Sequence, residues 1–524
     1  MATGAELTYN TGATATQMAN AIFGDGVTVV GASYTGDTRS KAIYSNGQLS
    51  PGVVPSNTGV ILSTGLAASF TQSNGDPNRS SQTSTDTSGA NNNAQFNALA
   101  GTNTYDASIL DVDFIPTGNV MTMTFVFSSE EYPEYASSQF NDTVGIWVNG
   151  TNVPLSIGNG TTSVTNISPN VNANQYISNT GDQFNTEMDG FTLKLTLNIP
   201  VNPGVVNSIR IGVADVSDAS YDSNLLIGAD SVQTTLVAAD DLKTMTPGQT
   251  KTIDVLGNDT NTTGGTLTVT HINGVAVVAG QSVVLPSGDT VTLNADGTLS
   301  VTTDSDADTF SFTYGVQSST GASDIGVVTV DTIPCFVAGT RIRTPAGEVA
   351  VEDLRPGDLV MTLDHGAQPL RWTGRRRVEA QGRLAPVRIA AGTFGSHGTL
   401  LVSPQHRILI RDGLAGVLFG EEEVLVAAKD LVDKRRVRQA SGGTVVYVHL
   451  LFDRHQVIFA EGLATESFLH GPQTSRAFEQ EIVDEILTIF PGIDLATGAG
   501  YGPAARRALR SYEAQLLVNG GVAA

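Results

Sequence analysis

The sequence has little of four things that often reveal a protein's class: cysteine, basic residues in its first part, aromatic residues and long apolar runs. The single cysteine, Cys335, excludes an intramolecular disulfide framework. Residues 1–334 hold 7 Lys and Arg against 30 Asp and Glu, a net charge of 7 − 30 = −23. This argues against nucleic-acid binding, which needs a basic surface. No run of about 18 apolar residues is present, so we expect no membrane-spanning helix.

The N-terminus also lacks a recognisable export signal. Its first residues, MATGAELTYNTGATATQ, do not show the basic and then apolar order of a secretory signal peptide. The acidic front section nevertheless fits a protein that stays soluble outside the cell. We therefore expect a secreted or cell-surface protein whose export signal lies elsewhere, and the C-terminal tail is the expected place.

What the sequence has in quantity is glycine and short alternating runs. It contains 56 glycines and only 15% charged residues, which favours turn-rich β structure over long charged helices. Alternating runs at 27–30, 59–65 and 121–127 predict strands, 16–23 predicts a short helix, and the polar stretch 69–93 predicts a long surface loop. We expect an all-β multidomain protein with a β-rich module at 1–238, a small Ig-like β-sandwich at 239–332, a third β domain at 335–470 and a helical tail at 471–524.

The second domain is predicted by short strands about 10 residues apart, with Asp296-Gly297 as a hairpin turn. Its segment 254–259, DVLGND, resembles the cadherin-like and VCBS-type repeats of bacterial adhesins. The resemblance implies a spacer role. Three aspartates at alternating positions are a candidate Ca²⁺ site: Asp304, Asp306 and Asp308.

Two acidic stretches mark the first domain. They are FSSEEYPEY, running on to Asp142, and IGVADVSD, followed by YDS at 221–223. With TYDASILDVDF they resemble the choice-of-anchor L module of bacterial surface proteins. Hard oxygen donors grouped in a loop suit Ca²⁺, although such residues often cap turns and face water instead. The candidate ligands are Glu130, Glu131, Glu134 and Asp142.

Cys335 stands where the acidic part of the chain gives way to an Arg-rich part. A cysteine thiol can form a five-membered ring with the carbonyl group of the preceding residue, here Pro334, so that the amide rearranges to a thioester. The alternative is structural, because a free cysteine is often a small buried apolar residue. The residue alone does not decide between the two.

The sequence that follows the cysteine favours chemistry. The hexad CFVAGT leads through a strand-forming segment to an E-x-L-x-x-G-D-x-V arrangement. Residues 335–360 therefore resemble the opening of the Hint modules shared by Hedgehog autoprocessing domains and inteins. The resemblance implies a β fold in which Cys335 is the nucleophile. The five positions are Glu352, Leu354, Gly357, Asp358 and Val360.

Two later segments supply candidate acid and base groups. LLVSPQHR matches the T/S-x-x-H element of Hint modules, which implies that Ser403 polarises the scissile amide and His406 protonates its nitrogen. Residues 446–462 resemble the penultimate intein block, in which His455 matches the block histidine and the role of His449 is less defined. Asp453 is expected to orient one of the two imidazoles. In the alternative reading, His455 and Asp453 only close a β-turn.

The end of this module departs from the intein pattern. In inteins three residues follow the glycine that matches Gly462 and then His-Asn, whereas this chain has Glu466-Ser467 after the three residues that follow Gly462. Serine cannot form the cyclic imide that cuts the C-terminal junction, so we expect no splicing. In the tail, apolar residues at helical spacing predict one amphipathic helix at 475–490 and another helix at 504–518.

The resemblance therefore implies self-cleavage at the Pro334–Cys335 bond through a thioester, with no cofactor, resolved by water, an amine or a thiol. The fixed φ of Pro334 predicts a slow reaction. Two alternatives stay open. The chain is an adhesin or matrix protein with an inactive Hint domain, or the domain is an intein remnant.

Overall fold

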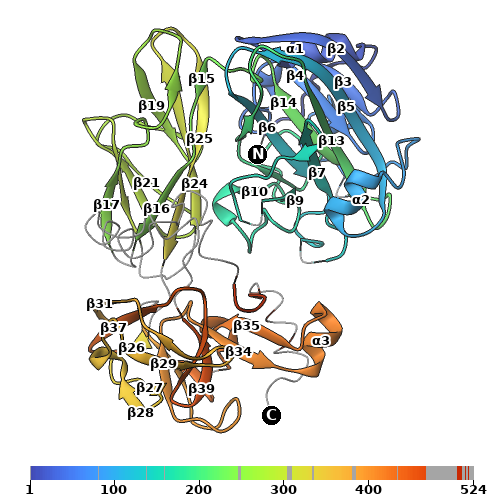
Figure 1. Ribbon diagram of the computed structural model, residues 1–524. Coiled ribbons are helices and arrows are strands. Elements are labelled where there is room, and N and C mark those ends of the chain that lie inside the picture. Colours follow the sequence, from blue (N-terminus) through green and yellow to red (C-terminus); the bar gives the residue numbers. More distant parts are fainter. Residues whose placement is uncertain are drawn as a thin grey trace. The chain divides into compact units, whose positions relative to one another are not determined.

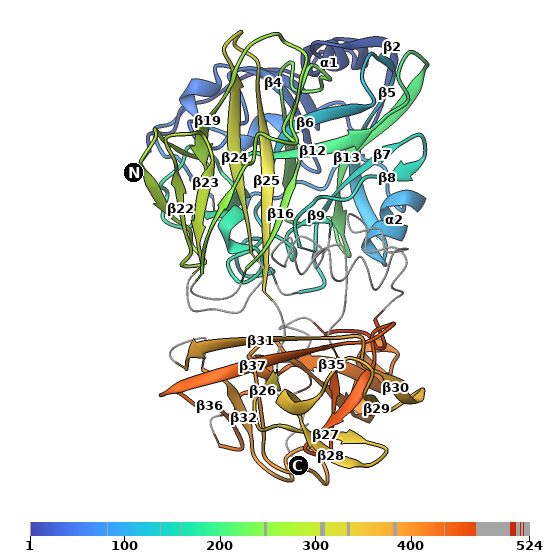
Figure 2. The same ribbon diagram turned by 60° about the vertical axis from the view of Figure 1, so that its left-hand side comes forward.

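The structure is a computed structural model. It describes residues 2–80, 82–136, 138–158, 160–245, 249–303, 310–332, 336–380, 385–433, 435–467 and 504–509, with Ala514 and Leu517. Two compact units emerge: the first takes in 1–241, 252–301 and 310–329, and the second takes in 242–251, 302–309 and 330–524. Antiparallel sheets make up both (Figure 1; Figure 2), which confirms the predicted all-β class.

Two sheets form the N-terminal part of the first unit. The larger has the order β1 (Thr8–Asn10), β3 (Lys41–Ser45), β4 (Gly59–Ser63), β14 (Ser223–Gly228), β6 (Val120–Ser129), β11 (Gly190–Thr192) and β10 (Tyr176–Ser178), and β12 (Leu195–Pro200) also pairs with β6. The smaller has the order β2 (Val27–Thr35), β5 (Thr104–Pro116), β13 (Asn207–Val216), β7 (Thr143–Val148) and β8 (Thr151–Asn152), and β9 (Thr162–Ser163) also pairs with β7.

Alternate residues of both sheets meet in one apolar core. Leu110, Val112 and Phe114 of β5 join Phe125 and Phe127 of β6 in a single buried cluster. Successive side chains of a strand point to opposite faces, so this spacing of two places one face of each strand inward. The alternating runs of the sequence therefore predict the sandwich correctly.

Helices are few and short. Helix α1 (Ala15–Ile22) begins at a capping box formed by Thr14 and Gln17, and it confirms the predicted helix to within a residue. Helix α2 (Ala94–Ala100) was not predicted, although Asn93 caps its N-terminus. Single turns of 3₁₀ helix lie at η1 (Gly47–Leu49), η2 (Ala67–Phe70), η3 (Ala173–Gln175), η4 (Val351–Asp353) and η6 (Ala428–Leu431).

The predicted β-sandwich is present and its hairpin turn is confirmed: Asn294 donates its backbone N–H to Thr298, and Gly297 has φ of 87°. Asp304, Asp306 and Asp308 lie outside the described residues. One sheet runs β16 (Asp241–Met245), β25 (Ser323–Thr332), β24 (Phe310–Ser318), β19 (Leu267–Ile272) and β20 (Val275–Ala276), and the other runs β17 (Thr250–Ile253), β23 (Leu299–Thr302), β22 (Thr290–Leu293) and β21 (Ser282–Val284). Strands β15 (Leu236–Val237) and β18 (Thr260–Asn261) form a separate pair.

The second unit contains two further sheets around one core. The first has the order β31 (Trp372–Glu379), β37 (Thr444–Leu451), β26 (Phe336–Val337), β33 (Leu400–Val402), β32 (Val387–Ile389) and β36 (Val437–Gln439). The second has the order β28 (Gly347–Ala350), β27 (Arg341–Thr344), β38 (Val457–Ala460), β39 (Leu463–Glu466), β34 (Arg407–Arg411) and β35 (Glu423–Ala427), with β29 (Leu359–Thr362) between β38 and β30 (Gly366–Pro369). Helix α3 (Gly413–Phe419) joins β34 to β35.

The C-terminal tail differs from its prediction. The helix expected over 475–490 lies outside the described residues. The helix expected over 504–518 is wrong for 504–509, because Leu425 of β35 bonds through its backbone to both Arg507 and Leu509. Leu509, Ala514 and Leu517 are buried in the second core. In the part of the chain that the structure describes, no helix is long and apolar enough to cross a membrane.

Candidate active site

Strand β26 brings the predicted site segments together. Phe336, the residue after the predicted nucleophile, pairs with Val402 of β33 on one side and with Val448 of β37 on the other. Figure 2 shows β26 beneath β37. Cys335 and Pro334 themselves lie outside the described residues. The segments that carry the predicted site residues therefore lie side by side in one sheet.

A tight turn presents the predicted acid. Ser403 follows β33, and the backbone N–H of His406 donates to its carbonyl oxygen at 3.0 Å. Ala428 and Lys429 close the turn from outside, since their N–H groups donate to His406 and Pro404 at 2.9 Å each. The Ser403 and His406 residues are 3% and 2% exposed. The S-x-x-H spacing thus fixes both side chains in the interior.

The His406 ring lies against the first residue of β26. Its centroid is 4.3 Å from that of Phe336, with 59° between the ring planes. Neither ring nitrogen has a hydrogen-bond partner among the described residues. Burial lowers the pKa of His406 to about 4, helped by Arg407 and opposed by the carboxylate of Glu466. The imidazole is therefore neutral at pH 7.

His455 is paired with a glutamate that sequence reasoning missed. Its Nε2 lies 3.5 Å from Oε2 of Glu466, and both side chains are fully buried. Arg407 donates to the same carboxylate through its backbone N–H at 2.9 Å and through Nη1 at 3.3 Å. Burial alone raises the pKa of Glu466, but Arg407 and His455 outweigh it and lower the pKa to about 2. Glu466 is thus an ionised buried carboxylate beside His455.

Asp453 does not have the expected partner. Its two carboxylate oxygens accept hydrogen bonds from Nε and Nη2 of Arg371 at 2.8 and 2.7 Å. The side chain is 46% exposed, whereas His449 and His455 are buried. The prediction that Asp453 orients an imidazole is therefore corrected: one residue separates it from His455, but its side chain points outward to Arg371. The sequence feature that could have identified Glu466 as a site residue is its position, since it stands where inteins carry the histidine of His-Asn.

His449 follows the strand partner of Phe336 along β37 and is 6% exposed. Its ring stacks on Trp372 with 6.5 Å between centroids and 26° between planes. Gly374 is its partner on β31, and a Cβ at Gly374 would lie 2.2 Å from the indole. Glycine therefore leaves room for Trp372 beside His449. A catalytic role for His449 stays a prediction.

The end of β39 has no residue for splicing chemistry. Ser467 occupies the place of the intein asparagine, and it is 1% exposed. Its hydroxyl accepts the backbone N–H of Gln456 at 2.9 Å, and its own N–H donates back to the Gln456 carbonyl at 2.8 Å. The hydroxyl is thus used to close the β38–β39 hairpin region.

Three of the four candidate Ca²⁺ ligands of the first unit are buried, and the fourth, Glu134, is exposed. The alternative that these carboxylates face water therefore holds for Glu134 alone. Glu130 accepts the N–H groups of Thr83 and Asp189, at 2.9 and 3.2 Å. Burial raises the pKa of Glu130 to about 8, that of Glu131 to about 9 and that of Asp142 to about 7. No group of three His, Cys, Asp or Glu arranged to hold a metal is found in the described ranges. Calcium binding stays a prediction.

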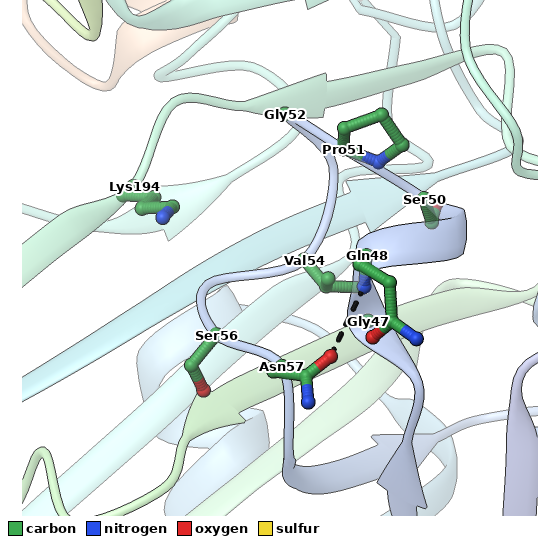
Figure 3. A pocket seen from close by; sticks show the side chains of 9 residues that line it. All are labelled: Gly47, Gln48, Ser50, Pro51, Gly52, Val54, Ser56, Asn57 and Lys194. Atoms are coloured by element: carbon green, nitrogen blue, oxygen red, sulfur yellow. Dashed lines mark hydrogen bonds between the residues drawn. The ribbon is translucent and has the colours of Figure 1, made fainter.

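A pocket in the first unit holds none of the predicted site residues (Figure 3). The loop between η1 and β4 forms most of it, and the N–H of Gln48 donates to Oδ1 of Asn57 at 3.2 Å. Its one ionisable side chain is Lys194, whose pKa burial lowers. The lining residues are Gly47, Gln48, Ser50, Pro51, Gly52, Val54, Ser56, Asn57 and Lys194.

Two solved structures are similar to part of this chain. A bacterial intein-like domain from Clostridium thermocellum is 18% identical, covering 25% of this chain and 96% of its own, with a TM-score of 0.17. The MchDnaB-1 intein is 12% identical, covering 25% of this chain and 98% of its own, with a TM-score of 0.17. No curated protein matches.

Three family models match consecutive parts of the sequence. Residues 7–233 match the Choice-of-anchor L domain, 233–331 match a bacterial Ig domain, and 334–472 match the Hint domain. The first and third of these resemblances were stated from the motifs alone, and both are confirmed. The chain is a three-domain protein that carries a Choice-of-anchor L domain, a bacterial Ig domain and a Hint domain, in that order.

Proposed function

We propose that the Hint domain cuts its own chain at the Pro334–Cys335 bond. One observation carries the proposal: the buried His406 ring lies against Phe336, the residue that follows the predicted nucleophile. An acid for the departing amide nitrogen has to lie near that position, and His406 does so with both ring nitrogens uncommitted among the described residues.

The reaction balances with these groups. The thiol proton of Cys335 moves to a ring nitrogen of His406 while the sulfur attacks the carbonyl carbon of Pro334. His406 then gives this proton to the Cys335 nitrogen as the C–N bond breaks and the new C–S bond remains. The products are a thioester to residues 1–334 and a free amine on Cys335. Ser403 is proposed to polarise the amide.

The His406 pKa of about 4 suggests that the reaction is slow. A thiol has an ordinary pKa of about 8.5, so proton transfer to His406 is uphill. The conjugate acid, once formed, gives its proton readily to the leaving nitrogen. The fixed φ of Pro334 adds to the barrier.

The reaction is expected to end with cleavage at the N-terminal junction and not to proceed to splicing. Ser467 replaces the asparagine that would cyclise, and its hydroxyl is bonded to Gln456. Water, an amine or a thiol resolves the thioester, and no cofactor is needed. The Choice-of-anchor L domain supports a surface-associated protein, so residues 1–334 are proposed to be the part that is released or attached outside the cell.

The test is incubation of the purified chain with a small thiol. Cleavage yields pieces of about 35 and about 20 kDa from the 54.6 kDa chain, in proportion to 334 and 190 residues. Cys335→Ala abolishes the pieces and His406→Gln slows their appearance by about a hundredfold or more, the usual range for a general acid. His271→Gln, an exposed histidine of the Ig domain, is the matched control and cleaves normally.

The second candidate function is an adhesin whose Hint domain is inert. The packed β domains of the first unit support it, since they form without any need for cleavage. A wild-type chain that stays whole with thiol favours this function.

A further inference from the structure

One ring nitrogen of His455, Nδ1, accepts a hydrogen bond from the C-terminal tail, and the other, Nε2, has no hydrogen-bond partner among the described residues. The backbone N–H of Ala505 donates to Nδ1 at 3.0 Å. On the other side, Nε2 faces Oε2 of Glu466 at 3.5 Å. Ala505 lies 50 residues further along the chain, so this contact depends on the tail being docked.

The described tail residues are fastened to the second unit by several independent contacts. Leu425 accepts the N–H of Leu509 and donates its own N–H to Arg507, each at 2.8 Å. The guanidinium of Arg506 reaches Glu423 at 2.6 Å and Asp364 at 2.7 Å. Leu509 is buried in the core of the unit. The position of the Ala505 N–H is therefore fixed by the fold.

We propose that Ala505 and Glu466 are positioning residues that select one tautomer of the His455 ring, the one with its proton on Nε2. A backbone N–H can only donate, so Nδ1 must keep its lone pair. The single proton of the neutral ring then sits on Nε2 and points at the carboxylate of Glu466. Residues 504–509 thereby contribute a hydrogen-bond donor to the site of the Hint domain.

This tautomer matters for the cleavage reaction, on which the functional part of the inference rests. Nε2 of His455 faces Glu466, and the carboxylate of Glu466 raises the pKa of His406. The docked tail therefore holds the His455 ring with its Nε2 proton toward the carboxylate that acts on His406.

The direct test reads the His455 ring nitrogens by NMR in the full-length chain with ¹⁵N-labelled histidine, and His455→Gln assigns the signals. The wild-type ring is expected to show a protonated Nε2 and an unprotonated Nδ1. Ala505→Pro removes the N–H and should give a mixture of tautomers, whereas Ala505→Gly keeps the N–H and the wild-type pattern. A proton on Nδ1 in the wild-type chain overturns the proposal without any variant.

Cleavage gives the second readout. Ala505→Pro is expected to slow thiol-induced cleavage several-fold and to shift its pH profile, while Ala505→Gly stays within about twofold of wild type. Equal rates and equal tautomers in the two variants overturn the inference even if the wild type cleaves. If the wild-type chain never cleaves, the proposed function is wrong. The inference about the His455 tautomer is still tested in that case, because NMR measures the tautomer without cleavage.

Discussion

Three buried carboxyl groups of the first unit and the buried Glu466 of the Hint domain have pKa shifts in opposite directions. In the first unit, burial raises the pKa of Asp222 to about 6, of Asp142 to about 7 and of Glu130 to about 8. Their described partners are backbone N–H groups and hydroxyls, such as Ser223 for Asp142. In the Hint domain, a cation lies beside the carboxylate, and the pKa of Glu466 falls to about 2. The direction of the pKa shift of a buried carboxyl group therefore depends on its partner as well as on its burial.

This difference has opposite consequences for stability. A carboxylate with a raised pKa binds its proton more tightly when folded, so the stability it contributes is lost as pH rises through that pKa. The Hint groups have lowered values: His406 loses its contribution as pH falls from about 6.5 to about 4, and Glu466 loses its contribution as pH falls from about 4.5 to about 2.

The largest effect is expected from breaking the Hint ion pair. Glu466→Ala leaves the buried His455 and the Arg407 side chain, which is 35% exposed, without their carboxylate. Breaking a fully buried pair typically costs about 3–5 kcal/mol, and the exposure of Arg407 puts the expected loss at the low end, about 3 kcal/mol. Calorimetry should show the Hint transition falling while the transition of the first unit stays in place. Glu134→Ala, at an exposed position, is the control and should move neither transition. A loss spread equally over both transitions would contradict this assignment.

A smaller and opposite effect is expected from Asp142→Asn. Asparagine keeps an oxygen for the Val216 N–H, and it carries no charge that burial penalises. The folded Asp142 stays protonated up to about pH 7, whereas the unfolded residue ionises near pH 3.8. The gain in the free energy of unfolding should therefore be roughly 2–3 kcal/mol larger at pH 8 than at pH 5, at about 1.4 kcal/mol per pKa unit. Denaturant titrations at the two pH values measure this. Destabilisation at pH 8 would show that the ionised form is needed.

The two units should respond to pH in opposite directions. Between pH 8 and pH 5 the first transition is expected to rise as its buried carboxyls take up protons. The Hint transition is expected to fall over the same interval, because His406 is protonated more easily when unfolded. Scanning calorimetry on the Cys335→Ala chain, which cannot cleave, follows both. If both transition temperatures changed in the same direction with pH, the expected difference between the two units would be wrong.

The smallest expected effect is that of Ca²⁺. Within the described ranges no basic side chain forms an ion pair with Glu130, Glu131 or Asp142, so a bound cation should raise the melting temperature of the first unit, most strongly at high pH. The increase should disappear with chelator, and Mg²⁺ at the same ionic strength is the control. An unchanged melting temperature at millimolar Ca²⁺ would refute the Ca²⁺ prediction.

Local patterns were sufficient for the parts of the fold that depend on them. Alternating apolar residues predicted strands such as β6, and the S-x-x-H match identified Ser403 and His406, which the structure places in one turn. The loop at 69–93 was read as free surface, yet the N–H groups of Thr83, Thr85 and Thr87 donate to Glu130, Asp222 and Asp106. Those carboxylates lie 19 to 137 residues away along the chain. Such pairings depend on tertiary structure, which no local pattern encodes.

The same reason explains the errors at the candidate site. Asp453 is two residues from His455, and proximity in sequence suggested a pair, but the side chain turns outward to Arg371. Glu466 reaches His455 because β38 and β39 form a hairpin that brings 457 opposite 466. The bond from Ala505 spans 50 residues. The sequence motifs identify the histidines, and the fold chooses their partners.

The most direct measurement of self-cleavage is the mass of the N-terminal piece released by hydroxylamine. The account predicts a fragment of residues 1–334 ending in a hydroxamate at Pro334, because hydroxylamine attacks a thioester at its acyl carbon. An unbroken chain after long incubation, a fragment ending elsewhere, or the same fragment from Cys335→Ala would contradict it.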